Sequence, residues 1–419
     1  MDDDKCVYDW SSLSCTPEAS CSLQYQLGDV TPSQACRVSD TSNATKVPQQ
    51  LHLAFAGREA GTVVGGLKAN TKDFYKVGNA KNKHYRSGLS SFTTARAAGD
   101  ESTFTVAVYG DMGADDNSVA TNKYVNSLVD EVDFVYHLGD ISYADNAFLT
   151  AKNVFGFYYE QVYNKFMNSM TNVMRQMAYM VLVGNHEAEC HSPTYLLSKS
   201  KKDQLGNYSA FNSCFRMPSP ESGGVLNMWY SYEYGTAHFT TLSIETDYAN
   251  APSNAYFTKR VYGGFGDQLV WLEEDLKAAD ANRDNVPWII VGMHRPMYTI
   301  RSCDPDGVPN NDYEARNVQE AFEELFIKYK VDLVLQGQVH TYERLYPTAN
   351  NSAIMAGVSR DNKTYENPKH PCTLLQELQE AQKDSNPTNL TLAMIESATG
   401  ITHDEFSVIK SSATQDSTQ

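Results

Sequence analysis

The chain has 419 residues, of which 41% are hydrophobic, and a formal net charge of −17 at pH 7. This length is enough for one large domain and a smaller one, and no run approaches the roughly 18 apolar residues of a membrane helix. The acidity argues against a nucleic-acid or anionic-membrane partner, because no basic stripe is present to replace the counterions of a polyphosphate. A phosphate-bearing substrate would need strong local positive charge, which metal ions can supply.

Cysteine and sequon usage indicates the compartment. The eight cysteines include no Cys-X-X-Cys pair, so thiolate zinc sites are not expected. The first residues, MDDDKCVYDWSS, lack the apolar segment of a secretory signal, so we expect that a signal was removed or that the start is incomplete. Five Asn-X-Ser/Thr sequons begin at Asn43, Asn207, Asn350, Asn362 and Asn389. The even number of cysteines and the sequons together predict a secreted, disulfide-bonded glycoprotein rather than a cytosolic chain with incidental sequons.

Residues 1–46 and 47–100 differ from the rest of the chain. The first segment is polar, holds four of the cysteines and shows little periodicity, which predicts a small disulfide-tied extension or a loose tail. The second contains short alternating segments separated by Gly and Asn, which predict β-strands, and residues 66–78 are typical of a strand pair. About 50 residues is half the usual size of a β-sandwich, so we expect an abbreviated domain.

From residue 101 to 349 apolar strands alternate with amphipathic stretches, which predicts an α/β domain. Helices are expected around 125–132, 266–280 and 318–330, where apolar residues recur at helical spacing. The remaining segment, 350–419, is a polar tail with one helix expected at 373–384 and disorder at its end. The expected strands of the α/β domain are 104–109, 133–138, 180–183, 238–244, 288–291 and 333–335.

Side chains with metal-ligand chemistry follow five of these strands. In α/β folds ligands gather at the carboxyl ends of strands, and a glycine precedes each candidate, as expected where the backbone turns around a shared centre. One Asp after a strand is usually a turn residue or a helix cap, but five such motifs in order indicate one site. The motifs GDMG, GDISYAD, GNHE, GMHRPMY and GQVHTYER offer Asp111, Asp140, Tyr143, Asn185, His186, Glu187, His294, Gln338 and His340.

The donor chemistry of these side chains fits two metal ions. Carboxylate and phenolate oxygens suit a hard trivalent ion, whereas imidazole and amide donors suit a divalent ion such as zinc, iron or manganese. A single aspartate can bridge both ions. Two neighbouring ions clamp a phosphoryl group, lower the pKa of a bound water to make the nucleophile, and stabilise the leaving oxygen.

The ordered motif set resembles that of the purple acid phosphatases within the metallophosphoesterase superfamily. The resemblance covers most of residues 48–347 and includes RMPSPESGG, MWYSYEYGTAHF and WLEEDL, which are similar to the long forms with an N-terminal fibronectin-like domain. Tyr143, close behind Asp140, distinguishes this family from other metallophosphoesterases. The resemblance implies a four-layer α/β (α+β) sandwich preceded by a small β-sandwich domain.

The resemblance also implies a role for each ligand. One ion would be ferric, and its phenolate bond would give the family's purple colour. A metal-activated hydroxide would attack phosphorus, and acid pH optima fit this because a ferric ion keeps its water deprotonated well below neutrality. The implied assignments are Asp111, Tyr143 and His340 to the ferric ion, Asp140 to both ions, Asn185 and His294 to the divalent ion, and His186 with Asn185 to the substrate, with His186 also helping to protonate the leaving group.

Gln338 departs from the family's Gly-His-X-His pattern, because it stands where the first histidine would bind the divalent ion. A glutamine carbonyl is a neutral, weaker donor toward zinc or iron(II) and suits manganese or magnesium better. We therefore expect weaker divalent binding and reduced turnover with an intact ferric side. The shortened β-sandwich and the sequence CTLLQELQEAQ, in place of a returning core strand, are further departures that divergence, splicing or a faulty gene model could produce.

Three residues outside the ligand set have roles that the sequence leaves open. Arg295 could touch the substrate phosphate or pair with a carboxylate. Cys190 and Cys214 flank the insert after GNHE and could form a disulfide that braces the rim of the site.

The expected function is a secreted acid phosphatase that hydrolyses small phosphate monoesters through an iron(III) and divalent-metal centre. One alternative is a phosphodiesterase or nucleotide pyrophosphatase on the same fold. Another is a metal-binding glycoprotein that has lost catalysis through Gln338. The sequence leaves open which ester is hydrolysed and the oligomeric state, for which a homodimer is one option.

Overall fold

A computed structural model of the protein describes residues 66–76, 87–149, 156–252, 261–299, 314–340 and 345–356 with their side chains. Outside these ranges it describes the course of seven further strands and of Tyr313, the first residue of helix α9. The Asn43, Asn362 and Asn389 sequons lie outside the described residues, as do the chain's final residues.

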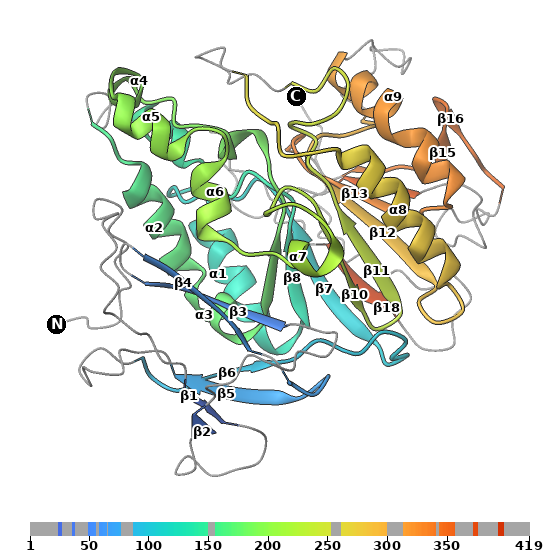
Figure 1. The fold of residues 1–419 in the computed structure, drawn as a ribbon, viewed down its shortest axis with the longest axis horizontal. Coiled ribbons are helices and arrows are strands. Elements are labelled where there is room, and N and C mark those ends of the chain that lie inside the picture. Colours follow the sequence, from blue (N-terminus) through green and yellow to red (C-terminus); the bar gives the residue numbers. More distant parts are fainter. Residues whose placement is uncertain are drawn as a thin grey trace, which may run out of the picture.

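Two β-sheets face each other at the centre of the main domain (Figure 1). The four-stranded sheet has the order β18-β7-β8-β9, in which β7 (Phe104–Tyr109), β8 (Phe134–His137) and β9 (Ala178–Val181) are parallel. Strand β18 (Ala393–Ser397) pairs antiparallel with β7. Because three strands run in parallel, their carboxyl ends and the loops that follow emerge at the same edge.

The six-stranded sheet has the order β10-β11-β12-β13-β17-β14. Its parallel centre is formed by β11 (Ala237–Thr241), β12 (Trp288–Met293), β13 (Leu333–Gln336) and β17 (Cys372–Leu375). The flanking strands β10 (Tyr230–Tyr234) and β14 (Glu343–Arg344) are antiparallel to their neighbours. The loops after β12 and β13 thus lie at one edge of this sheet.

The inner faces of the two sheets form a tight apolar layer. Val108 and Tyr136 of one sheet and Phe239 and Leu335 of the other are all completely buried in it. The hydroxyl of Tyr136 reaches across to Thr241 Oγ1 at 2.7 Å. This approach explains Gly292 in β12, since a Cβ there would lie 1.9 Å from the Tyr136 hydroxyl.

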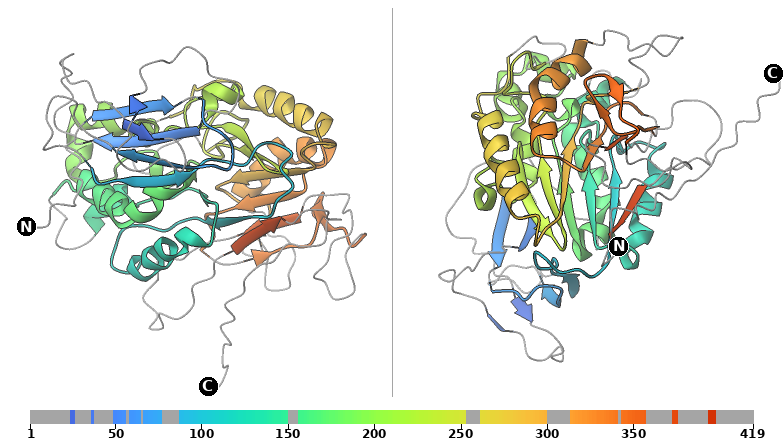
Figure 2. Two further views of the ribbon diagram at one scale, coloured as in Figure 1. Left: turned by 90° about the horizontal axis from the view of Figure 1, so that it is seen from below. Right: turned by 90° about the vertical axis from the view of Figure 1, so that its right-hand side faces the viewer.

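Helices cover the outer faces of both sheets, which completes four layers. On the four-stranded sheet lie α1 (Val119–Ser127), the 3₁₀ turn η1 (Leu128–Asp130), α2 (Tyr159–Ser169) and α3 (Thr171–Gln176). On the six-stranded sheet lie α8 (Gln268–Ala281) and α9 (Tyr313–Lys328), gold and orange in the right-hand view of Figure 2. The predicted four-layer sandwich is therefore confirmed.

A helical insert follows β9. It contains the 3₁₀ turn η3 (Asn185–Glu187), α4 (Pro193–Leu197), α5 (Lys199–Leu205), α6 (Ser209–Cys214) and α7 (Ser219–Ser222). Another 3₁₀ segment, η2 (Ala144–Leu149), follows β8. Among the described residues, no helix has the length and apolar character needed to cross a membrane.

The N-terminal strands form two small sheets apart from the central pair (Figure 2). One has the order β2-β1-β5-β6 and contains β2 (Cys36–Arg37), β1 (Gln24–Gln26), β5 (Lys72–Lys76) and β6 (Ser90–Thr93). The other is a hairpin of β3 (Gln49–Phe55) and β4 (Arg58–Val64). The buried side chain of Tyr75 in β5 donates a hydrogen bond to the Arg175 carbonyl of α3 at 2.8 Å, which ties the first sheet to the main domain.

The prediction of a helix at 373–384 is wrong for residues 373–375, the part of this segment that the structure describes. Residues 372–375 form strand β17, whose Leu374 stands opposite Leu335 of β13. The helical spacing of leucines predicted an amphipathic helix, but pairing with a buried parallel strand overrides a weak local preference.

Strands β15 (Thr348–Ala349) and β16 (Ser352–Ala353) form a short hairpin.

Candidate metal centre

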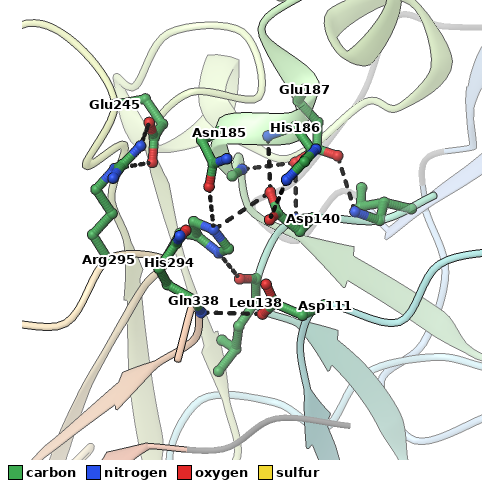
Figure 3. Close-up of polar contacts among 12 residues, drawn as sticks. Asp111, Leu138, Asp140, Asn185, His186, Glu187, Glu245, His294, Arg295 and Gln338 are labelled. Carbon is green, nitrogen blue, oxygen red and sulfur yellow. Dashed lines mark hydrogen bonds and ion pairs between the residues drawn. The ribbon is translucent and has the colours of Figure 1, made fainter. Parts of the chain in front are cut away.

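The loops at the carboxyl ends of strands from both sheets meet in one place (Figure 3). The four-stranded sheet contributes the loops after β7, β8 and β9, and the six-stranded sheet contributes the loops after β12 and β13. The residues that the structure brings together there include Asp111, Asp140, Asn185, His294 and Gln338.

The tightest group consists of Asp111, Asp140 and His294, all completely or almost completely buried. One ligand atom from each lies within 4.8 Å of the others. His294 donates its Nδ1 proton to the Leu138 carbonyl at 2.7 Å, while its Nε2 lies 3.2 Å from Asn185 Oδ1 and 3.4 Å from Asp140 Oδ1. A neutral ring would aim its Nε2 lone pair at two oxygen atoms, so a proton or a metal ion must lie among them. This donor set fits a metal ion.

Tyr143 and His340 extend the group on the Asp111 side. The Tyr143 hydroxyl donates to Asp111 Oδ1 at 3.1 Å and lies 3.2 Å from His340 Nε2. His340 Nε2 is 3.5 Å from the same Asp111 oxygen. A carboxylate, a phenol and an imidazole thus point to one position, which is suitable for a hard trivalent ion.

Gln338 lies beside His294 and Asp111. Its backbone N–H donates to Asp111 Oδ2 at 3.1 Å, and its amide oxygen Oε1 is buried without a hydrogen-bond partner among the described residues. A buried acceptor left without a donor costs about 1–3 kcal/mol. The orphaned oxygen therefore fits the expected ligand role, since a cation would satisfy it.

Glycines next to the ligands are required by close approach. A Cβ on Gly184 would lie 2.3 Å from Asp140 Oδ1, and one on Gly139, where φ is +87°, would lie 2.6 Å from His294 Nδ1. Five of the candidate ligands have left-handed backbones, which carry strain and cluster at functional sites. The φ values are 53° for Asp111, 49° for Asp140, 52° for Tyr143, 74° for Gln338 and 42° for His340.

His186 lies next to the ligands and is oriented by Asp145, which the sequence analysis did not single out. His186 Nδ1 is 2.9 Å from Asp145 Oδ2, and Nε2 is 3.8 Å from Asp140 Oδ2. Burial alone would lower the pKa of His186, but the carboxylates of Asp145 and Asp140 outweigh it and raise this pKa to about 10. The two carboxylates therefore favour the protonated imidazole. Asp145 ends the motif GDISYAD, which also contains the candidates Asp140 and Tyr143. This shared motif was the one feature of the sequence that could have pointed to Asp145.

Glu187 ends the motif GNHE, and the sequence suggested no particular role for it. Its buried carboxylate accepts hydrogen bonds from the backbone N–H groups of Asp140, Ile141 and Gly184 at 2.8 to 2.9 Å. The loop after β8 and the turn after β9 are thereby joined. Glu187 follows GNH directly, but nothing in the sequence alone told which backbone groups it would meet.

Arg295 pairs with carboxylates, the second of its two expected roles. Its guanidinium makes a bidentate pair with the buried Glu245 at 2.8 and 2.9 Å and also contacts Glu314 at the start of α9. These contacts engage Nε, Nη1 and Nη2. The arrangement fixes the loop after β12 to neighbouring elements and does not direct Arg295 at a substrate phosphate.

The expected disulfide between Cys190 and Cys214 is not formed in the structure, where both side chains are buried. The Cys190 thiol lies 3.8 Å from the Asp145 carbonyl, as a weak donor would, and burial raises its pKa to about 12. A thiol of such high pKa stays protonated and unreactive. The insert is therefore held by packing around these cysteines instead of by a covalent bond.

Two of the five sequons lie among the described residues. Asn350 is exposed at the tip of the β15–β16 hairpin, as expected for a glycan acceptor. Asn207 is half-buried, and its Oδ1 accepts the Gly263 N–H at 2.8 Å. The polar sequence context was the same, so the sequence did not separate an exposed asparagine from one that anchors a neighbouring segment.

A four-layer sandwich whose strand-end loops gather carboxylate, imidazole, amide and phenol donors defines the metallophosphoesterase class. The calcineurin-like phosphoesterase model matches residues 104–342, more than half of the chain. The chain belongs to this family.

Within this family, the chain is similar to several acid phosphatases. The chain is 30% identical to an acid phosphatase of Aspergillus ficuum over 72% of its own length and 62% of the relative's. It is 31% identical to human acid phosphatase type 7, over 64% and 53% of the two chains, and 27% identical to purple acid phosphatase 22 of Arabidopsis thaliana, over 70% and 55%. The chain thus spans between about half and three-fifths of the length of these relatives.

A solved structure supports the fold. The purple acid phosphatase from yellow lupin seeds superposes with a TM-score of 0.60, covering 93% of this chain and 69% of that one. Sequence identity is 19%, so this likeness concerns the fold alone.

Proposed function

We propose that the protein is an acid phosphatase that hydrolyses small phosphate monoesters with a binuclear metal centre. The observation that carries the proposal is the buried group of Asp111, Asp140 and His294, whose ligand atoms lie within 4.8 Å of one another. Acid phosphatases among the relatives support the reaction type.

The proposed assignment gives each metal position its own donors. Iron(III) would be held by Asp111, Tyr143 and His340, which already share contacts of 3.1 to 3.5 Å. When bound, the two ions would supply positive charge for the phosphoryl group and lower the pKa of a water molecule. The second ion is proposed to be zinc, iron or manganese, with Asn185, His294 and Gln338 as its donors and Asp140 shared between both positions.

His186 is proposed to deliver a proton to the leaving group. Its Nδ1 faces the Asp145 carboxylate, which leaves Nε2 for the substrate, and the side chain is 19% exposed, so a bound ester can reach it. A protonated imidazole has the charge needed to contact a phosphate oxygen and the proton needed by an alkoxide leaving group. Asn185 would orient the same phosphate from the adjacent position.

Secretion and glycosylation remain part of the proposal, supported by the five sequons and by the exposed position of Asn350. We propose no nucleic-acid or membrane partner, in line with the net charge of −17.

The first test is metal analysis of the purified protein together with its visible spectrum and p-nitrophenyl phosphate hydrolysis at pH about 5, the acid range suited to a ferric centre. One iron and one divalent ion per chain, a tyrosinate band and turnover are expected. Asp140→Asn, which keeps the side-chain shape but removes the shared charge, should lose both metal and activity. Absence of bound metal in the wild type would contradict the proposal, and faster cleavage of bis(p-nitrophenyl) phosphate would favour a phosphodiesterase instead.

A weakened enzyme is the second candidate, because a neutral amide stands at the divalent position. Gln338→His should tighten Zn²⁺ binding about tenfold or more and raise turnover, since imidazole is the better donor for zinc. The measurement is isothermal titration of metal-depleted protein with Zn²⁺ and with Mn²⁺. Gln336→His is the matched control, because Gln336 is a buried glutamine whose Oε1 accepts the Met297 N–H. Equal Zn²⁺ affinity in wild type and Gln338→His would rule out Gln338 as a ligand.

A further inference from the structure

Two loops of the site are joined by hydrogen bonds that run in both directions (Figure 3). Glu187 Oε2 accepts the N–H groups of Asp140 at 2.9 Å and Gly184 at 2.8 Å, and Oε1 accepts that of Ile141 at 2.9 Å. In return, Asp140 Oδ1 accepts the N–H of His186 at 2.9 Å. Each loop therefore supplies a carboxylate to the backbone of the other.

The backbone of the loop after β8 needs such support. Gly139 has φ of +87° and Asp140 has φ of +49°, so two consecutive residues are left-handed, which is unfavourable for aspartate. The N–H groups of Asp140 and Ile141 point away from the strand ladder into a buried space. Without an acceptor they would favour a different loop conformation, because a buried N–H is rarely left unpaired.

The chemical type of the side chain at 187 is specific to this task. A carboxylate offers acceptors only, on both oxygens, and so can receive three N–H groups at once. An amide would turn an NH₂ group toward one of these donors.

We infer that Glu187 is a positioning residue for the divalent metal site. It holds Asp140 and, through the turn Gly184–Glu187, Asn185 in the relative position in which both side chains can bind one ion. Glu187 itself has no place among the metal donors. The inference rests on the proposed metal centre, but not on the identity of the substrate.

The test is Glu187→Gln, with Glu189→Gln as the matched control. Glu189 is also buried, but its carboxylate accepts hydrogen bonds from the hydroxyls of Tyr262 at 2.8 Å and Tyr195, which lie on segments that carry no proposed ligand. Both variants make the same chemical change in the same stretch of chain. The readouts are the Kd of metal-depleted protein for Mn²⁺, the thermal midpoint, and kcat and KM for p-nitrophenyl phosphate.

Glu187→Gln should raise the Mn²⁺ Kd about 10- to 100-fold, the usual effect of losing a residue that orients metal ligands. Added Mn²⁺ should recover part of kcat in this variant. Glu189→Gln should lower the thermal midpoint with a Mn²⁺ Kd within about threefold of wild type, since it leaves the ligand loops intact. Equal Mn²⁺ Kd values in all three proteins would overturn the inference and leave Glu187 a structural residue.

Two further measurements cover the case in which Glu187→Gln does not fold. Amide hydrogen exchange on the wild type should show protection at Asp140, Ile141 and Gly184, although these residues lie in loops. Exchange at the rate of an open loop would refute the inference. Glu187→Asp keeps the carboxyl group but shortens its reach, and should raise the Mn²⁺ Kd above that of wild type. If wild type binds Mn²⁺ but cleaves no phosphate ester, the proposed function fails while these results still decide the role of Glu187.

Discussion

Asp145 sets both the direction and the protonation of the His186 side chain. Its completely buried carboxylate lies 2.9 Å from His186 Nδ1 and 3.3 Å from His191 Nδ1, so it is fixed from two sides. The negative charge is one cause of the raised pKa of His186. Asp145 thus both orients the imidazole and favours its protonated form.

Asp145→Asn should lower kcat by roughly 10- to 100-fold while leaving metal content unchanged. The variant removes the charge that raises the pKa of His186, so the alkaline limb of the pH profile should move to lower pH. Measuring kcat against pH for p-nitrophenyl phosphate checks both expectations. Asp116→Asn is the control, since Asp116 is a fully exposed aspartate in a surface ion pair with Lys165. Loss of metal in proportion to activity would instead make Asp145 a determinant of metal binding.

Among individual residues, the sequence predicted the convergence of the candidate ligands better than the contacts that support them. Asp111, Asp140 and His294 follow strands and glycines in a repeated pattern, so their convergence could be inferred. The partners of Glu187 are backbone groups of another loop, and no residue type in the sequence marks them. For Cys190 and Cys214 the sequence predicted a disulfide that the structure does not form. Two cysteines that flank one insert need not lie close enough in space to be bridged.

The turn after β9 has room for glycine only. Gly184→Ala would bring a methyl group to 2.3 Å from Asp140 Oδ1 and 2.6 Å from the Asp140 N. We expect a loss of about 1–3 kcal/mol in the free energy of unfolding, the usual range for overpacking, together with weaker metal binding. Urea denaturation measures the first and Mn²⁺ titration the second.

Gly88→Ala provides the reference for that experiment. A Cβ at Gly88 would meet nothing within 4 Å, and its φ is not left-handed. Alanine there should leave the free energy of unfolding within about 0.5 kcal/mol of wild type. If both substitutions lower the free energy of unfolding equally, the close packing of the turn against Asp140 does not explain the effect of Gly184→Ala.

At the scale of elements, long buried strands were predicted well and context-dependent ones were not. Strand β7 occupies the expected residues 104–109, because an uninterrupted apolar run between turn signals has few alternatives. Strand β9 begins and ends two residues earlier than expected, and β17 replaces a predicted helix. Strand β17 exists because β13 offers it a parallel partner, which is information that local periodicity does not contain.

For the molecule as a whole, acidification has opposing effects on the stability of the folded state. The net charge of −17 at pH 7 falls toward zero near the pI of 5.0, which relieves self-repulsion. His137, completely buried at the end of β8, acts in the other direction. Burial lowers the pKa of its imidazole to about 3, so the folded protein keeps His137 neutral while the unfolded chain takes up a proton below about pH 6.5.

The stability that neutral His137 contributes is therefore complete above pH 6.5 and is lost as the pH falls toward 3. Between pH 7 and pH 5 this loss is about 2 kcal/mol. His137→Asn keeps a polar group opposite the Tyr179 hydroxyl, which lies 2.8 Å from His137 Nδ1, but cannot titrate. The difference in unfolding free energy between wild type and variant should shrink by about that amount over this range. A constant difference in urea titrations at both pH values would show that His137 is not the group responsible.

The proposed metal donors come from both sheets, and this division has a consequence for biosynthesis. Asp111, Asp140 and Asn185 leave the ribosome before His294 and Gln338, which lie more than a hundred residues further along. At about 5–20 residues per second, the chain from Asn185 to His294 takes roughly 5–20 s to synthesise. During that interval the nascent chain presents carboxylates without the imidazole that completes the cluster. Metal loading is therefore expected to follow completion of the second sheet, which makes it a late event in maturation.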